Sequence, residues 1–263
     1  MIIIKNMVRA SKIAAPEGQK LPWQLLLLWA LLPLGGVIAF ARVALPELPA
    51  GAERVRVRDL ARTARFRWVL LAMALAGATE LGLAQWTSAF AQRGLGWSQL
   101  VADLVGFACF ALGMAIGRLW YGVAGSGERL PQWLLRAALA SLAIHLIAAL
   151  SPWPLLALIA CASGGCAVSL LWPWTVSHAA ALWPLAGASL FALLAAAGDA
   201  GAALNPWLIS IAADAAAATP AWWWSLIPVD TPEATSLRVG LLVGALSPLL
   251  LAIVAWRLRR AEP

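Results

Sequence analysis

The stretch AALASLAIHLIAALSPWPLLALIACASGGCAV, residues 137–168, belongs to a run of 62 residues, 137–198, that contains no Asp, Glu, Lys or Arg. Soluble domains carry about 25% charged residues, so a run of this length cannot form the surface and loops of one. A membrane helix needs about 20 mostly apolar residues, and this run is long enough for about three. It therefore predicts helices that cross a lipid bilayer.

The rest of the chain extends the same pattern. Of 263 residues, 62% are hydrophobic and only 12% are charged. The sequence predicts an all-α, polytopic membrane protein with about seven transmembrane helices, at residues 22–45, 68–91, 98–121, 132–150, 155–180, 184–213 and 237–257. It divides into a basic N-terminal tail (1–21), an isolated transmembrane helix (22–45), an arginine-rich cytoplasmic linker (46–67) and a six-helix unit (68–260).

Basic residues predict the orientation. With the linker in the cytoplasm, that side collects Arg42, the six linker arginines, Arg118, Arg129, Arg136, Arg257, Arg259 and Arg260, thirteen in all. The far side collects Arg93, Arg238 and the tail residues Lys5, Arg9, Lys12 and Lys20, six in all. The excess predicts a cytoplasmic C-terminus in a bacterial-type inner membrane, with the tail as the exception.

The net charge of +7 does not predict a nucleic-acid partner. The arginines lie in short blocks between apolar runs, where they set topology and contact anionic lipid head groups. The expected surroundings are therefore the lipid bilayer.

Two acidic residues inside expected helices are the candidates for chemistry. A charge at the centre of a membrane helix costs at least about 2.5 kcal/mol, so it must face a packed or water-filled interior. Gly198, Gly201 and Asn205 lie on the helix face adjacent to Asp199, which either binds a proton or substrate or makes an interhelical hydrogen bond.

Glu80 is the second acid, twelve residues into the helix 68–91. Gln85 and Trp86 follow it, and a polar amide beside an aromatic ring suits a hydroxyl-rich or zwitterionic ligand. The alternative is a polar patch that only stabilises the helix bundle.

Other chemistry is not expected. The sequence has no serine–histidine–aspartate set, no phosphate-binding glycine loop and no histidine or cysteine cluster with metal-ligand spacing, so we expect no enzyme activity, metal or cofactor. Two Gly-x-x-x-Gly patterns, Gly113 with Gly117 and Gly240 with Gly244, predict close helix packing.

Several of these motifs resemble the major facilitator superfamily of transporters, and most closely its fucose-permease-like branch. The stretch 77–122 is similar to the seventh and eighth helices, through Gly77, Glu80 and Trp86 and through Gly117, Arg118 and Gly122. The stretch 198–214 is similar to the eleventh helix, and "LLWPW" at 170–174 to the proline-bearing tenth.

The resemblance implies that the seven helices correspond to the sixth through twelfth of a twelve-helix fold. It implies a secondary carrier, such as a proton symporter, for a small polar solute such as a sugar, bound between two six-helix halves. Glu80 and Asp199 would then face the central cavity with Gln85, Trp86 and Asn205. Arg118, next to Gly117, would anchor a cytoplasmic gate by pairing with acids or helix C-terminal carbonyls.

The family's first five helices have no counterpart in this chain. Three alternatives follow: a truncated gene product, a half-transporter that pairs with a copy of itself or another chain, or a remnant without transport. A membrane protein with only a structural or regulatory role is the competing class.

Overall fold

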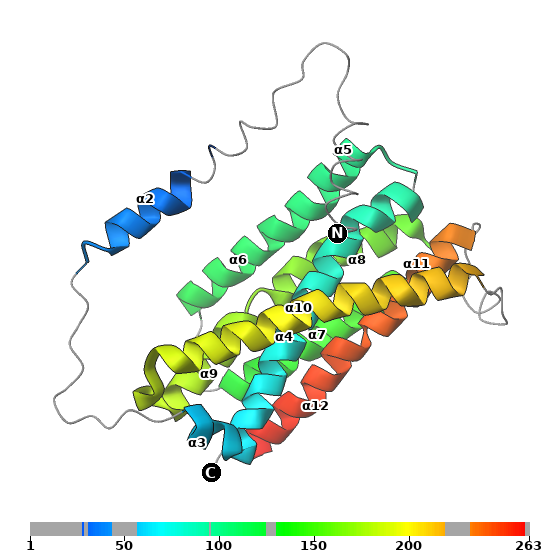
Figure 1. Ribbon diagram of the computed structural model, residues 1–263. Coiled ribbons are helices and arrows are strands. Elements are labelled where there is room, and N and C mark those ends of the chain that lie inside the picture. Colours follow the sequence, from blue (N-terminus) through cyan, green and yellow to red (C-terminus); the bar gives the residue numbers. More distant parts are fainter. Residues whose placement is uncertain are drawn as a thin grey trace. The chain divides into compact units, whose positions relative to one another are not determined.

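The structure, a computed structural model, describes residues 28, 31–43, 57–94, 96–124, 130–218 and 232–260. The chain divides into two compact units, Met1–Ala52 and Glu53–Pro263. The described part of the first unit contains the helix α2 (Leu31–Phe40), which lies inside the expected span 22–45 (Figure 1). The expected tail, 1–21, lies outside the described residues.

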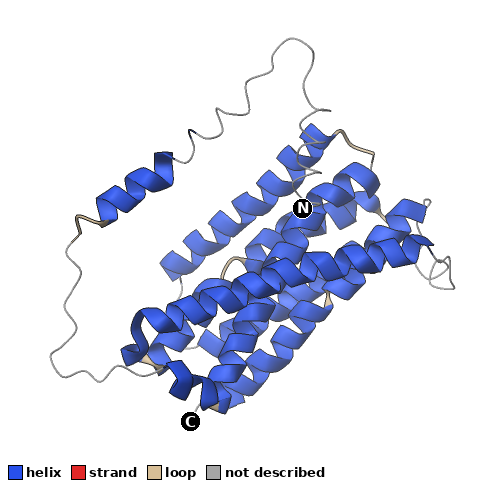
Figure 2. Cartoon of the chain, in the orientation of Figure 1, coloured by secondary structure: helices blue, strands red, loops and turns tan. Residues whose placement is uncertain are grey.

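The described residues of the second unit form helices joined by turns, without strands (Figure 2). Six segments of this described part are long and apolar enough to cross a membrane: Ala64–Arg93, Gln99–Val123, Pro131–Leu150, Leu155–Leu182, Pro184–Ala218 and Thr235–Arg260. They coincide with the last six spans expected from the sequence. This confirms an all-helical, membrane-embedded unit.

All but one of these spans consist of more than one helical element. The first span follows α3 (Val57–Arg62) and consists of α4 (Ala64–Ala89) and a π-helical end, η2 (Phe90–Gly94). The second contains α5 (Gln99–Val101), η3 (Ala102–Phe107) and α6 (Ala108–Ala124). The others are α7 (Leu130–Leu150), α8 (Pro154–Val168) with α9 (Leu171–Leu182), η5 (Pro184–Ala186) with α10 (Gly187–Ala218), and α11 (Pro232–Gly244) with α12 (Leu246–Arg260).

Thr63 determines where α4 begins. Its hydroxyl accepts a hydrogen bond from the backbone N–H of Phe66 at 3.4 Å and donates one to the carbonyl of Leu60 in α3 at 2.8 Å. Such a side chain satisfies one of the free N–H groups at a helix start. The helix therefore begins four residues before the expected position 68, and the last residues of the expected linker are helical.

Helices α4 and α10 pack against each other through glycines. A Cβ atom on Gly77 would overlap the backbone carbonyl of Gly198, and one on Gly201 would overlap the carbonyl of Ala74. In lipid, helix association depends on van der Waals packing and interhelical hydrogen bonds, which small residues make possible by allowing a close approach. The two backbones therefore approach closely at these glycines, where the helices cross (Figure 1).

The Gly-x-x-x-Gly patterns pack within the unit, as expected. Gly113 of α6 faces Cys166 of α8, where an added Cβ would lie 3.1 Å from the backbone nitrogen. Gly240 of α11 faces Ile209 of α10, with 2.9 Å from an added Cβ to the carbonyl oxygen. Both patterns thus join helices of the same chain.

Two spans are broken where the sequence has a proline. Pro173 is the third residue of α9, which begins after a turn at Ser169 and Leu170. Pro248 is likewise the third residue of α12, after a turn at Ala245. Proline is tolerated in a first helical turn because the backbone N–H it lacks has no partner there. Each break therefore starts a new helix.

The contact of α4 with α10 makes a stability prediction. Gly201→Ala should lower the free energy of unfolding by about 1–3 kcal/mol, the usual cost of overpacking, because the methyl group meets the Ala74 carbonyl. Thermal unfolding of the purified chain in detergent micelles measures this. Gly122→Ala in α6 is the control, since an added Cβ there has no neighbour within 4 Å. Equal stability of both variants would show that the close approach is not required.

Candidate functional site

Glu80 lies on α4 in the middle of a membrane span. Its side chain is half-buried, and its Oε2 atom is buried without a hydrogen-bond partner among the described residues. Because unpaired acids are costly in a membrane, they are a mark of proton, ion or substrate pathways. Glu80 is therefore the first candidate for a functional group.

A cleft of about 480 Å³ adjoins this carboxylate. It is lined by Glu80 of α4, Arg118 of α6, and Trp172, Pro173 and Val176 of α9, and we call it the Glu80 cleft. Ligand sites typically combine apolar walls with a few polar groups that orient the ligand. The Glu80 cleft has this composition, with one acid, one base and one indole ring.

The two charges of the cleft interact without forming a direct ion pair. Glu80 and Arg118 line the same cleft, and opposite charges at this range attract each other. Among the described residues, the single ion pair within 4.0 Å joins Arg62 and Asp59 in α3, so Glu80 and Arg118 lie farther apart than that. A polar solute between them could accept hydrogen bonds from the guanidinium and donate to the carboxylate.

Arg118 is fixed by the break between α8 and α9. Its Nε donates a hydrogen bond to the carbonyl of Ser169 at 3.1 Å. The preceding residue, Gly117, packs so closely on Ser169 that a Cβ would overlap the serine hydroxyl. The expected pairing of Arg118 with a carbonyl at a helix end is thus present, while its role in a gate stays a prediction.

Asp199 lies on α10 next to this region. Its side chain is exposed on the surface of the unit, and it does not line the Glu80 cleft. The preceding residue, Gly198, packs on Trp172, with 2.6 Å from an added Cβ to the ring. Asp199 is therefore next in sequence to Gly198, which contacts the cleft residue Trp172. The role of Asp199 in binding stays a prediction.

Asn205 makes hydrogen bonds between helices and does not line the Glu80 cleft. It is buried, and its Nδ2 donates to the carbonyl of Ala78 at 2.7 Å and to the hydroxyl of Ser247 at 3.3 Å. The Ser247 hydroxyl also accepts from Thr79 at 3.2 Å. This polar cluster links α4, α10 and α12 inside the bundle. An interhelical hydrogen bond was the alternative role expected for Asp199, and the structure shows such bonds at Asn205 on the same helix.

Gln85 and Trp86 lie apart from the Glu80 cleft. Gln85 is exposed, and Trp86 is buried in the main hydrophobic core at 8% exposure. Residues five and six positions after Glu80 point to other sides of a helix with 3.6 residues per turn. The structure therefore places neither of them among the residues that line this cleft with Glu80 and Arg118.

Sequence reasoning missed two features of the unit. Trp172, Pro173 and Val176 line the cleft, and the signal for them was the proline that restarts the helix. The second is Arg238, counted from sequence among far-side topology residues but fully buried, where its Nη1 donates to the carbonyls of Ala149 and Ser151. This arginine therefore caps the end of α7 from α11.

Comparison of the chain with protein-family models, curated proteins and solved structures gave no match. The resemblance to the major facilitator superfamily thus depends on the sequence motifs alone.

The contacts of Asn205 predict a structural role. Asn205→Ala should lower the free energy of unfolding by about 1 kcal/mol, since interhelical hydrogen bonds in membranes contribute about 0.6 kcal/mol on average and up to about 1.7. Unfolding in micelles measures it, with the exposed Ser210→Ala on the same helix as control. If unfolding is unchanged but solute binding is lost, Asn205 is a ligand contact.

Proposed function

We propose that this protein is a membrane carrier that binds a small polar solute in the Glu80 cleft. The observation that carries the proposal is that Glu80, an acid with an unpartnered oxygen, and Arg118 line the same cleft of a membrane unit. The sequence resemblance to the major facilitator superfamily supports the same class of function, and its fucose-permease-like branch suggests a sugar.

In this proposal, Glu80 and Arg118 orient the solute. The carboxylate accepts hydrogen bonds from hydroxyl or amino groups, the guanidinium donates to oxygens, and Trp172 offers an apolar ring face. The carboxylate can also hold a proton when the solute is absent, which makes proton symport the simplest form of coupling. Asp199, which follows Gly198 on α10, is the second acid available for the proton.

A carrier of this type needs a second wall for the cavity. In carriers with internal repeats the substrate site lies between the repeats, which rock around it. We propose that a second six-helix unit closes the cleft, supplied by a copy of this chain, by another chain or by a longer form of this one.

The proposed location is a bacterial inner membrane with a cytoplasmic C-terminus. Arg257 lies over the ring of Trp68 at 5.0 Å, and Arg260 lies over the ring of Trp256 at 3.9 Å. Tryptophan marks either head-group layer and an excess of arginine marks the cytoplasmic side, so the arginines in these pairs support placing the end of α12 at the cytoplasmic layer.

A structural or regulatory membrane protein is the alternative. The packing contacts of Asn205, Gly113 and Gly117 favour it, because residues singled out from sequence hold helices together. The two proposals differ in whether Glu80 can become a neutral amide without loss of function.

The test is solute-driven proton flux. The full chain is reconstituted in liposomes with an internal pH-sensitive dye, and a panel of sugars and zwitterions is added outside. Glu80→Gln should reduce the flux at least tenfold, because the amide cannot carry a proton and binds the solute differently. Asp199→Asn should reduce it if this acid completes the proton path.

The exposed acid Asp214 on α10 provides the matched control as Asp214→Asn. Wild-type flux in Glu80→Gln and in Asp199→Asn would show that the site is wrongly assigned. No flux with any member of the panel, together with lost folding in Gly113→Leu, would favour the structural alternative.

A further inference from the structure

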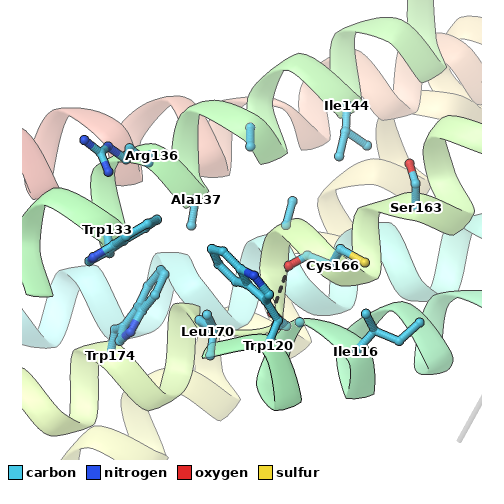
Figure 3. A pocket seen from close by; sticks show the side chains of 14 residues that line it. Ile116, Trp120, Trp133, Arg136, Ala137, Ile144, Ser163, Cys166, Leu170 and Trp174 are labelled. Atoms are coloured by element: carbon cyan, nitrogen blue, oxygen red, sulfur yellow. Dashed lines mark hydrogen bonds between the residues drawn. The ribbon is translucent and has the colours of Figure 1, made fainter. Parts of the chain in front are cut away.

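A second hollow of the unit lies between α6, α7 and the α8–α9 segment. Its volume is about 500 Å³, and its aromatic lining consists of Trp120 of α6, Trp133 of α7 and Trp174 of α9. Figure 3 shows these three indole rings around one end of the hollow, with Arg136 beside Trp133 and with Ile144 and Ser163 farther along. We call it the tryptophan crevice.

The three rings form one continuous aromatic group. Trp133 lies 6.0 Å from Trp120 and 5.9 Å from Trp174, measured between ring centroids. Trp174 is 3% exposed, whereas Trp120 is 56% exposed. The group thus extends from the interior of the unit to its surface. Tryptophan is enriched at the membrane–water interface because its ring is apolar and its N–H is polar.

The rest of the lining offers little to a polar ligand. Ile116, Ile144 and Leu170 are aliphatic, and the hydroxyls of Ser163 and Ser169 already donate to carbonyls of their own helix at 2.9 and 2.8 Å. A sugar or another hydroxyl-rich solute would lose its hydrogen bonds to water here without replacement. The occupant that fits this lining is apolar along most of its length.

Arg136 and Trp174 add polar groups at the aromatic end, beside the indole N–H groups of Trp120 and Trp133. The guanidinium of Arg136 lies over the Trp133 ring at 4.9 Å, and its side chain is exposed. The indole N–H of Trp174 is buried and has no hydrogen-bond acceptor among the described residues. One group is a cation and the other a donor, so both favour oxygen acceptors, and the cation favours a negative charge.

We propose that the tryptophan crevice binds an anionic phospholipid, with an acyl chain between α6 and α7 and the phosphate at Arg136. The apolar lining matches the chain, and the positive charge complements the head group. The surroundings of a membrane span supply such a molecule at high local concentration.

The tryptophan crevice and the Glu80 cleft meet at the turn between α8 and α9. Ser169 lines the crevice, and its carbonyl accepts the hydrogen bond from Arg118 of the cleft. A lipid in the crevice therefore contacts the turn that positions this arginine. Binding itself depends only on the crevice and is independent of any transport by the unit.

The test uses the purified full chain in nanodiscs of phosphatidylcholine. Phosphatidylglycerol with brominated acyl chains is added in increasing fractions, and quenching of tryptophan fluorescence reports contact with the indole rings. Brominated phosphatidylcholine gives the comparison for an uncharged head group. We expect half-maximal quenching at a clearly lower fraction of phosphatidylglycerol than of phosphatidylcholine.

Arg136→Gln should reduce this preference about fivefold, the equivalent of the roughly 1 kcal/mol that one arginine contributes near an anionic surface. Arg260→Gln is the matched control, because Arg260 also stacks on a tryptophan but lies outside the crevice. This control should retain the preference of the wild type.

A second pair of variants tests occupancy of the crevice. Ala140→Phe places a ring in the lining and should remove the preferential quenching, whereas Ala143→Phe, exposed on the same helix outside the lining, should not. Equal quenching by both lipids in the wild type would overturn the proposal, and so would an unchanged preference in Arg136→Gln. Unchanged preferential quenching in Ala140→Phe would also overturn it, because the lipid would then lie elsewhere.

Discussion

The contact between the backbones of α4 and α10 is the constraint on which the site depends. Within a bilayer the hydrophobic effect does not favour helix association, because lipid chains are as apolar as the side chains. Gly77, Gly198 and Gly201 let the two helices touch, and the hydrogen bonds of Asn205 fix their register. The position of Glu80 on α4 relative to α10 follows from this contact, and Trp172 of α9 packs on Gly198 beside it.

The break between α8 and α9 is the second constraint, and it relates the two hollows of the unit. Because the helix restarts at Leu171, Trp172 and Pro173 line the Glu80 cleft while Leu170 and Trp174 line the tryptophan crevice. The free carbonyl of Ser169 receives Arg118 and thereby holds α6 to the same turn. One interruption in a membrane helix thus positions a charged cleft and an aromatic crevice.

Buried polar groups in the unit have two kinds of environment. Thr79, Asn205 and Ser247 satisfy one another inside the bundle. Glu80 belongs to the second kind, because one of its oxygens is buried without a partner among the described residues, as are the indole nitrogen of Trp174 and two nitrogens of Arg238. A polar group with its hydrogen bonds satisfied stabilises the packing, whereas one without a partner marks a place where a ligand or proton can bind.

The sequence alone determined the membrane character and the six spans of the second unit, because an apolar run of sufficient length can only be satisfied as a helix in lipid. It also pointed to Glu80, since an isolated acid stands out in such a run. The sequence did not predict which side chains surround this acid. Proximity along the chain suggested Gln85 and Trp86, but the arrangement of helices brought Arg118 and Trp172 to Glu80 and turned Asn205 into the bundle. Which side chains meet depends on helix rotation and crossing, and these are set by glycine contacts between segments far apart in sequence.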